Sequence, residues 1–97
     1  MCILMCMKVT WDEPKRQTNI RDHGFDLVDA KRLFAGPTWV VEDTRFAYGE
    51  QRFVAYGLIA GRFAVCVFVH RRDARHIISL RKGTKHEERT YFRLLTD

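Results

Sequence analysis

The spacing of apolar residues changes at Pro37, and this change constrains the fold of the 97-residue chain more than any other feature. Before Pro37 the apolar residues recur at helical intervals. After it, β-branched and aromatic residues form short runs separated by polar or glycine-containing turns. Because the helical and strand patterns are mostly segregated, the sequence favours an α+β fold in which helices pack on a small antiparallel sheet.

The segment before Pro37 is predicted to hold a short strand and two helices. The strand covers residues 8–11, and Asp12 can cap a first helix that runs to about His23. Gly24 supplies a left-handed stop, and Asp26 can cap the second helix. The apolar residues of that second helix share one face, which we expect in the core: Leu27, Ala30, Leu33 and Phe34.

The segment after Pro37 is predicted to hold four strands and a last helix. The strands cover residues 38–43, 52–60, 62–70 and 75–82, and their short connections imply antiparallel pairing. Residues 63–69 are continuously apolar and should form the most buried strand. Thr84-x-x-Glu87 is a capping box for a helix whose Tyr91, Leu94 and Leu95 should face the sheet. The predicted order is β-α-α-β-β-β-β-α.

The chain reads as a single domain over residues 1–97, with residues 1–7 as an extension. That apolar stretch has no basic region before it and no cleavage site, so it is not expected to be a secretory signal. No run approaches the roughly eighteen apolar residues that would span a membrane. Cys2, Cys6 and Cys66 lack zinc-site spacing, which favours reduced thiols in a cytoplasmic protein without metal or cofactor.

Positive charge is concentrated in residues 71–93. This stretch holds eight Lys and Arg against three acidic residues, and the rest of the chain balances, so it accounts for the whole net charge of +5. A charge field focused on one segment attracts a phosphate-bearing partner. A solvated basic helix beside a hairpin would give the same composition, so both interpretations stay open.

Two segments could carry proton-transfer chemistry. Lys15, Asn19 and His23 follow each other at intervals of four and so form one polar stripe on the first helix. His23 could exchange a proton with a ribose hydroxyl, although a histidine at a helix C-terminus is also favoured by the helix dipole. Glu50 could act as a general base, although a carboxylate two residues from Arg52 on the same strand face more often forms a surface ion pair.

The junction of the last strand and the last helix is a candidate phosphate site. Arg81, Lys82 and Lys85 lie beside the expected helix N-terminus, whose backbone N–H groups add positive potential. Strict strand alternation would place Arg75, Ile77, Ser79 and Arg81 on one face, and His76, Ile78, Leu80 and Lys82 on the other.

Several motifs stand in a specific order along residues 9–92. They are Trp11-Asp12-x-x-Lys15-x-x-x-Asn19-x-x-x-His23-Gly24, Gly49-Glu50-x-Arg52, Gly57, Gly61-Arg62, Ile77-Ile78-Ser79-x-Arg81-Lys82 and Glu88-Arg89-x-x-Phe92. In order and spacing they resemble the BrnT toxins of bacterial type II toxin–antitoxin systems. Two positions depart from the pattern of that family: Asp22 stands where it usually has Lys, and His76 where it usually has Arg.

The resemblance implies a RelE-like ribonuclease that cleaves RNA without metal and blocks translation. It also implies a cognate BrnA-type antitoxin with a ribbon-helix-helix module, a heterotetrameric complex with that antitoxin, and contact with DNA only through it. On this interpretation His23 or Glu50 transfers protons, and Arg52 and Arg81 stabilise charge on the phosphate. The expected RNA-binding residues are Lys15, Asn19, Arg71, Arg72, Lys82 and Lys85. A non-catalytic nucleic-acid-binding or protein-interaction module that uses residues 71–93 remains the alternative.

Overall fold

The computed structural model describes residues 8–45, 47 and 49–96. The elements in chain order are β1 (Lys8–Trp11), α1 (Glu13–His23), the 3-10 turn η2 (Leu27–Asp29), α2 (Ala30–Ala35), β2 (Trp39–Asp43), β3 (Arg52–Ile59), β4 (Arg62–Arg71), β5 (Ala74–Lys82) and α3 (Lys85–Thr96). The predicted order is confirmed, and the second helix is split into η2 and α2. The predictions for residues 1–7, including Cys2 and Cys6, lie outside the described residues.

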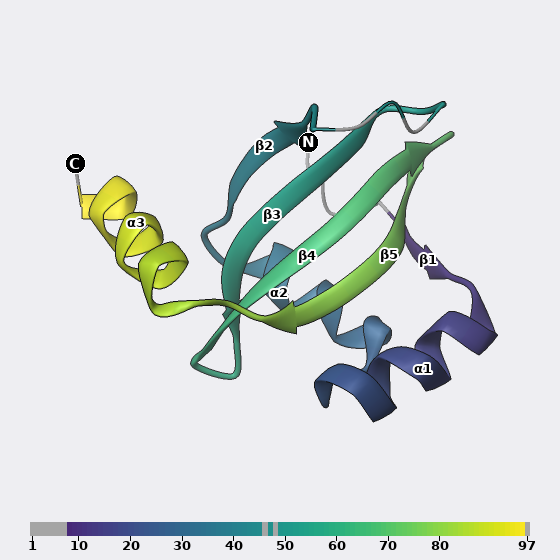
Figure 1. Cartoon of the computed structure of the whole chain (residues 1–97), viewed down its shortest axis with the longest axis horizontal. Coiled ribbons are helices and arrows are strands. Elements are labelled where there is room, and N and C mark those ends of the chain that lie inside the picture. Colours follow the sequence, from purple (N-terminus) through teal and green to yellow (C-terminus); the bar gives the residue numbers. More distant parts are fainter. Residues whose placement is uncertain (1–7, 46, 48, 97) are drawn as a thin grey trace.

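The described strands form one sheet in the order β1-β5-β4-β3-β2. The three pairs among β2, β3, β4 and β5 are antiparallel, as their short connections predicted. β1 pairs in parallel with β5, the last strand, although the whole of the intervening chain separates them. Figure 1 shows β1 and β2 at the two edges, with the long curved strands β3, β4 and β5 between them.

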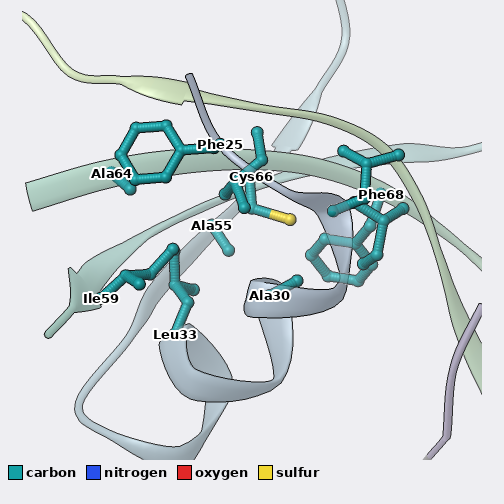
Figure 2. Packing of buried hydrophobic residues seen from close by; sticks show 11 residues of the cluster. Phe25, Ala30, Leu33, Ala55, Ile59, Ala64, Cys66 and Phe68 are labelled. Carbon is teal, nitrogen blue, oxygen red and sulfur yellow. The ribbon is translucent and has the colours of Figure 1, made fainter. Parts of the chain in front are cut away.

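One face of the sheet is covered by α1, η2 and α2, and we call it the helix-covered face. Leu27, Ala30 and Leu33 are fully buried there, as predicted from their helical spacing. In Figure 2 the side chains of Ala30 and Leu33 point towards Ala55 and Cys66 of the sheet. Cys66 is enclosed in this cluster, and its burial raises the pKa of the thiol to about 12. Most of β4 is buried, which confirms the strand predicted to be innermost.

The opposite face of the sheet, which we call the open face, is covered at one end by α3. Tyr91 of α3 is buried there against Val54, Phe63 and Val65. Its hydroxyl donates a hydrogen bond of 2.7 Å to the carbonyl oxygen of Pro37, which ties α3 to the start of β2. The expectation that Leu95 faces the sheet is wrong, because this side chain is 42% exposed.

Local signals at the helix ends are mostly confirmed. The capping box of α3 is complete, since the Glu87 N–H donates to Thr84 Oγ1 at 3.1 Å and the Thr84 N–H donates to Glu87 Oε1 at 2.9 Å. Gly24 ends α1 with φ of 73°, and the Asp26 carboxylate accepts the Val28 N–H at 3.1 Å. Asp12 stands at the N-cap position of α1, but its side chain makes no capping hydrogen bond, so that prediction is wrong in its mechanism.

A bulge in β5 changes which residues share a face. Val67 lies opposite Ser79 while Phe68 lies opposite Ile77, so Ile78 is an extra residue in β5. Ile77 and Leu80 therefore both join the core of the helix-covered face. The strict alternation expected from sequence is wrong, because Arg75 packs over the Phe34 ring at 4.1 Å on that face whereas Arg81 reaches α3 on the open face.

Candidate nucleic-acid interface

A line of mostly polar residues crosses the open face from one sheet edge to the other. The strand register places Thr10, His76, Val69, Arg52 and Asp43 opposite one another, and we call this line the polar row. Residues directly opposite in a sheet project from the same face. Arg52 precedes Val54 by two positions, and Val54 packs under Tyr91, so the polar row lies on the open face.

His76 is the member of the polar row suited to proton transfer. Its Nδ1 atom lies 2.9 Å from Thr10 Oγ1, a hydrogen bond that fixes the orientation of the ring. Burial, followed by the positive charge of Arg71, lowers the pKa of His76, while Asp12 and Glu50 act in the opposite direction. The imidazole is therefore largely neutral near pH 7 and able to accept a proton.

Glu50 and Arg71 form an ion pair beside the polar row. Arg71 Nη2 donates to Glu50 Oε2 at 3.2 Å, and both side chains are about half exposed. Arg71 follows Val69 by two positions in β4 and so projects from the same face. The partner that the structure gives Glu50 is thus a cation of β4, whereas the sequence had suggested Arg52 of β3.

Asp43 and Arg45 close the β2 end of the polar row. The Asp43 carboxylate is almost completely buried, and Arg45 donates to it from Nε at 2.9 Å and Nη2 at 3.0 Å. The Arg45 backbone N–H donates to the same carboxylate at 3.2 Å. Sequence reasoning missed this pair. In the sequence the pair is only an acidic residue followed two positions later by an arginine at the end of a strand. This pattern is too common to identify a functional site.

Arg81 also lies on the open face, at the end covered by α3. It stands opposite Val65, four positions along β4 from Val69 of the polar row, which is a distance of about 13 Å. Arg81 Nη1 and Nη2 each donate to the Glu87 carboxylate at 3.0 Å. These bonds and that of the Thr84 N–H lower the pKa of Glu87 to about 2. A phosphate that bound Arg81 would therefore have to displace the Glu87 carboxylate from it.

Comparison with known proteins decides the family. The family model described as the ribonuclease toxin BrnT of a type II toxin–antitoxin system matches residues 11–87. The chain belongs to the BrnT family of ribonuclease toxins. The resemblance found in the motifs is therefore confirmed, and with it the family's ribonuclease class and an antitoxin as the type of partner.

A solved structure of the BrnT family has a similar fold. The crystal structure of the Brucella abortus ribonuclease toxin BrnT matches with a TM-score of 0.63 and 33% sequence identity. The match covers 81% of this chain and 99% of that one. It supports the α+β assignment, with three helices around a mostly antiparallel sheet. No curated protein sequence matches the chain.

The BrnT motif residues of α1 do not join the polar row. His23 and Lys15 are exposed on α1, which packs against β5 from the helix-covered side. His23 ends α1 just before Phe25, whose ring lies 4.7 Å below the Arg62 guanidinium at the start of β4. Arg71, the partner of Glu50, stands at the other end of β4, about 30 Å away. His23 and Glu50 therefore cannot act on the same phosphate.

Asn19 is a structural residue. The side chain is only 4% exposed, and its Nδ2 donates to the carbonyl oxygens of Phe25 at 2.9 Å and Leu80 at 2.7 Å. Its Oδ1 accepts the Leu80 N–H at 3.1 Å. The expected exposed stripe is wrong at this position, because the amide joins α1 to β5 at Leu80, beyond Ile77, where the pairing of β5 with β1 ends. A side chain buried in this way is not placed to contact RNA.

The other cationic residues predicted to bind RNA are on the surface. Arg72 lies in the turn between β4 and β5 with φ of 59°, and Lys82 and Lys85 flank the start of α3. All three are exposed.

Among the described residues no group of three His, Cys, Asp or Glu side chains could hold a metal ion. Within the same residues no helix has both the length and the apolar character needed to cross a membrane.

Proposed function

We propose that this chain is the endoribonuclease of a type II toxin–antitoxin pair and that the polar row is its cleavage centre. The observation that carries the proposal is the juxtaposition of His76 and Arg52 on the open face, with the Glu50–Arg71 pair beside them. Two strand spacings separate His76 from Arg52, which puts their Cα atoms about 10 Å apart. Side chains at that separation can reach one phosphate from two sides.

The chemistry available to these groups is RNA cleavage by the adjacent 2′-hydroxyl. The neutral His76 imidazole takes the 2′-hydroxyl proton as the 2′-oxygen bonds to phosphorus. Arg52 and Arg71 stabilise the charge that develops on the non-bridging oxygens, and Glu50 holds Arg71 towards the row. The bond from phosphorus to the 5′-oxygen breaks, and that oxygen takes a proton from water. The products are a 2′,3′-cyclic phosphate and a 5′-hydroxyl, and no step requires a metal ion.

The proposed function also implies the binding partners of this chain. Cleavage of RNA would arrest translation, and a BrnA-type antitoxin with a ribbon-helix-helix module would neutralise the toxin in a heterotetramer. DNA would be contacted through that antitoxin. The concentration of the net charge of +5 in residues 71–93 supports this, because it would speed association both with RNA and with an acidic antitoxin segment.

The experiment that tests the proposal is cleavage of an end-labelled single-stranded RNA by the purified chain in excess EDTA. We expect cleavage with a 5′-hydroxyl on one product and a 2′,3′-cyclic phosphate on the other. Activity that vanished with chelator and returned with Mg²⁺ would overturn the metal-free route. Tight, salt-dependent RNA binding without turnover would identify the non-catalytic alternative.

A further inference from the structure

A groove lies between β2 and α3, at the covered end of the open face. It encloses a volume of about 220 Å³, and its walls include Trp39 and Tyr56 from the sheet and Tyr91, Thr90 and Glu87 from α3. Most of the lining is apolar or aromatic, and Glu87 supplies a carboxylate. No step of the cleavage mechanism uses these residues.

The walls of the groove are held in place by packing within the domain. Tyr91 is only 1% exposed, and its hydroxyl is fixed to the Pro37 carbonyl oxygen at 2.7 Å. The Tyr56 ring lies parallel to that of Phe63, with an angle of 7° and a centroid separation of 6.3 Å. Trp39, which stands opposite Tyr56, is 41% exposed. The groove therefore presents an accessible indole on a rigid support.

The groove is continuous with the proposed cleavage centre. Trp39, Tyr56, Val65 and Arg81 form a second line across the open face, parallel to the polar row. In β3, Tyr56 is four positions from Arg52, a distance of about 13 Å. A single strand with one phosphate at the polar row could thus place a base of a nearby nucleotide in the groove.

Glu87 gives the groove a hydrogen-bonding preference. Its Oε1 accepts from Arg81 Nη1 and from the Thr84 N–H, and its Oε2 accepts from Arg81 Nη2. A carboxylate offers about four acceptor positions, so Oε2 retains one for a further donor. The exocyclic amino groups of adenine, guanine and cytosine are such donors. Uracil has no amino group, and its N3–H lies between two carbonyl oxygens that repel a carboxylate.

We propose that the groove binds one amino-bearing nucleobase of single-stranded RNA, stacked on Trp39 and donating to Glu87. This inference rests on the proposed function, because it assigns a base subsite to the same substrate. Aromatic stacking of a base is sequence-tolerant, and the Glu87 carboxylate adds discrimination against uracil. The toxin would then prefer cleavage sites that carry adenine, guanine or cytosine a short distance from the broken bond.

The test uses uncleavable 2′-O-methyl oligonucleotides of adenosine and of uridine, with binding to the full chain measured by fluorescence anisotropy. We expect the adenosine oligomer to bind more tightly than the uridine oligomer. Trp39→Ala should weaken adenosine binding about tenfold and remove the preference, and Trp39→Phe should restore much of it. The matched control is Val40→Ala, since Val40 is 44% exposed and projects from the other face of β2.

Failure of this inference can be distinguished from failure of the proposed function. If wild type cleaves RNA but Trp39→Ala binds both oligomers as Val40→Ala does, only the base subsite is overturned. If Trp39→Ala loses antitoxin binding while its RNA affinity is unchanged, the groove belongs to the protein partner and the subsite is again overturned. If wild type neither binds nor cleaves RNA, both proposals fall together.

Discussion

The Arg81 guanidinium and the Glu87 carboxylate form a two-point ion pair, with both N–O distances at 3.0 Å, where β5 leads into α3. The same carboxylate accepts the Thr84 N–H at 2.9 Å, so one side chain joins the sheet, the turn and the first turn of the helix. This arrangement explains why α3 is fixed over one end of the open face although its apolar contact with the sheet centres on Tyr91.

Replacement of Glu87 should change stability in a pH-dependent way. The Arg81 pair lowers the pKa of Glu87 from its usual 4.5 to about 2, so the folded state favours the carboxylate. Its contribution is fully present above pH 4.5 and is lost as the pH falls towards 2. We expect Glu87→Gln to lower the free energy of unfolding by about 1 kcal/mol at pH 7, and the difference from wild type to shrink below pH 4.5.

Urea unfolding of both proteins between pH 7 and pH 2.5 would measure this effect. Glu88→Gln is the matched control, because it removes the same charge from the first turn of α3 without touching the capping box. Equal losses for the two variants at every pH would show that the Arg81 pair adds nothing specific.

Removal of the Asn19 amide should destabilise the fold more than any surface change on α1. Asn19→Ala leaves the Leu80 N–H and two carbonyl oxygens without their partners in a buried site. Unsatisfied buried groups of this kind cost about 1–3 kcal/mol, and we expect a loss near the upper end. Lys15→Ala, on the exposed side of α1, should stay within about 0.5 kcal/mol of wild type in the same unfolding experiment. Similar values for the two variants would contradict the structural role of Asn19.

Gly57 should not tolerate a methyl group. A Cβ atom added there would lie 2.9 Å from Leu33 Cγ, a buried atom of α2 that packs directly on β3. We expect Gly57→Ala to cost about 1–3 kcal/mol through overpacking. Gly36→Ala is the control, since a Cβ atom added at Gly36 would have nothing within 4 Å and the φ of this residue is −109°. A thermal unfolding midpoint for Gly57→Ala equal to that of Gly36→Ala would show that α2 can move away from the sheet without cost.

The elements could be predicted from the sequence because their signals are local. The change of period at Pro37, the stop at Gly24 and the Thr84–Glu87 capping box each act within a few residues, and each is confirmed. The parallel pairing of β1 with β5 and the bulge at Ile78 could not be predicted. Both depend on contacts between distant segments, for which a single sequence carries no periodic signal.

The candidate site could be predicted from the sequence only in part, because it too depends on contacts between distant segments. Glu50, Arg52 and Arg71 could be selected one at a time as charged residues near strand ends. Their grouping with His76 depends on strand register, which the bulge in β5 shifts by one residue. The sequence therefore offered no reason to group His76 with these three residues. His23 and Arg81 were grouped with Glu50 by motif order, whereas the fold separates them.

The two histidines now give a direct test of the cleavage centre. His76→Ala should lower the rate of RNA cleavage at pH 7.5 by about 10²-fold or more, the scale of a lost general base. His23→Ala should leave the rate near that of wild type, because α1 holds His23 on the helix-covered side of the sheet. The measurement is single-turnover cleavage of one end-labelled RNA, with circular dichroism to confirm that both variants fold. Loss of activity in His23→Ala but not in His76→Ala would return the centre to α1.

The pH dependence of the wild-type rate provides the second part of that test. A general base acts in its neutral form, and burial lowers the pKa of His76 below its usual 6.5. Activity should therefore be level around pH 7 and fall as the pH drops below 6.5 and the imidazole takes up a proton. His76→Arg keeps a positive charge at this position but cannot accept a proton near neutral pH. If His76→Arg cleaved RNA at the wild-type rate, and that rate did not fall at acid pH, the side chain at position 76 would act by stabilising negative charge on the phosphate. Glu50 would then be the general base to test next.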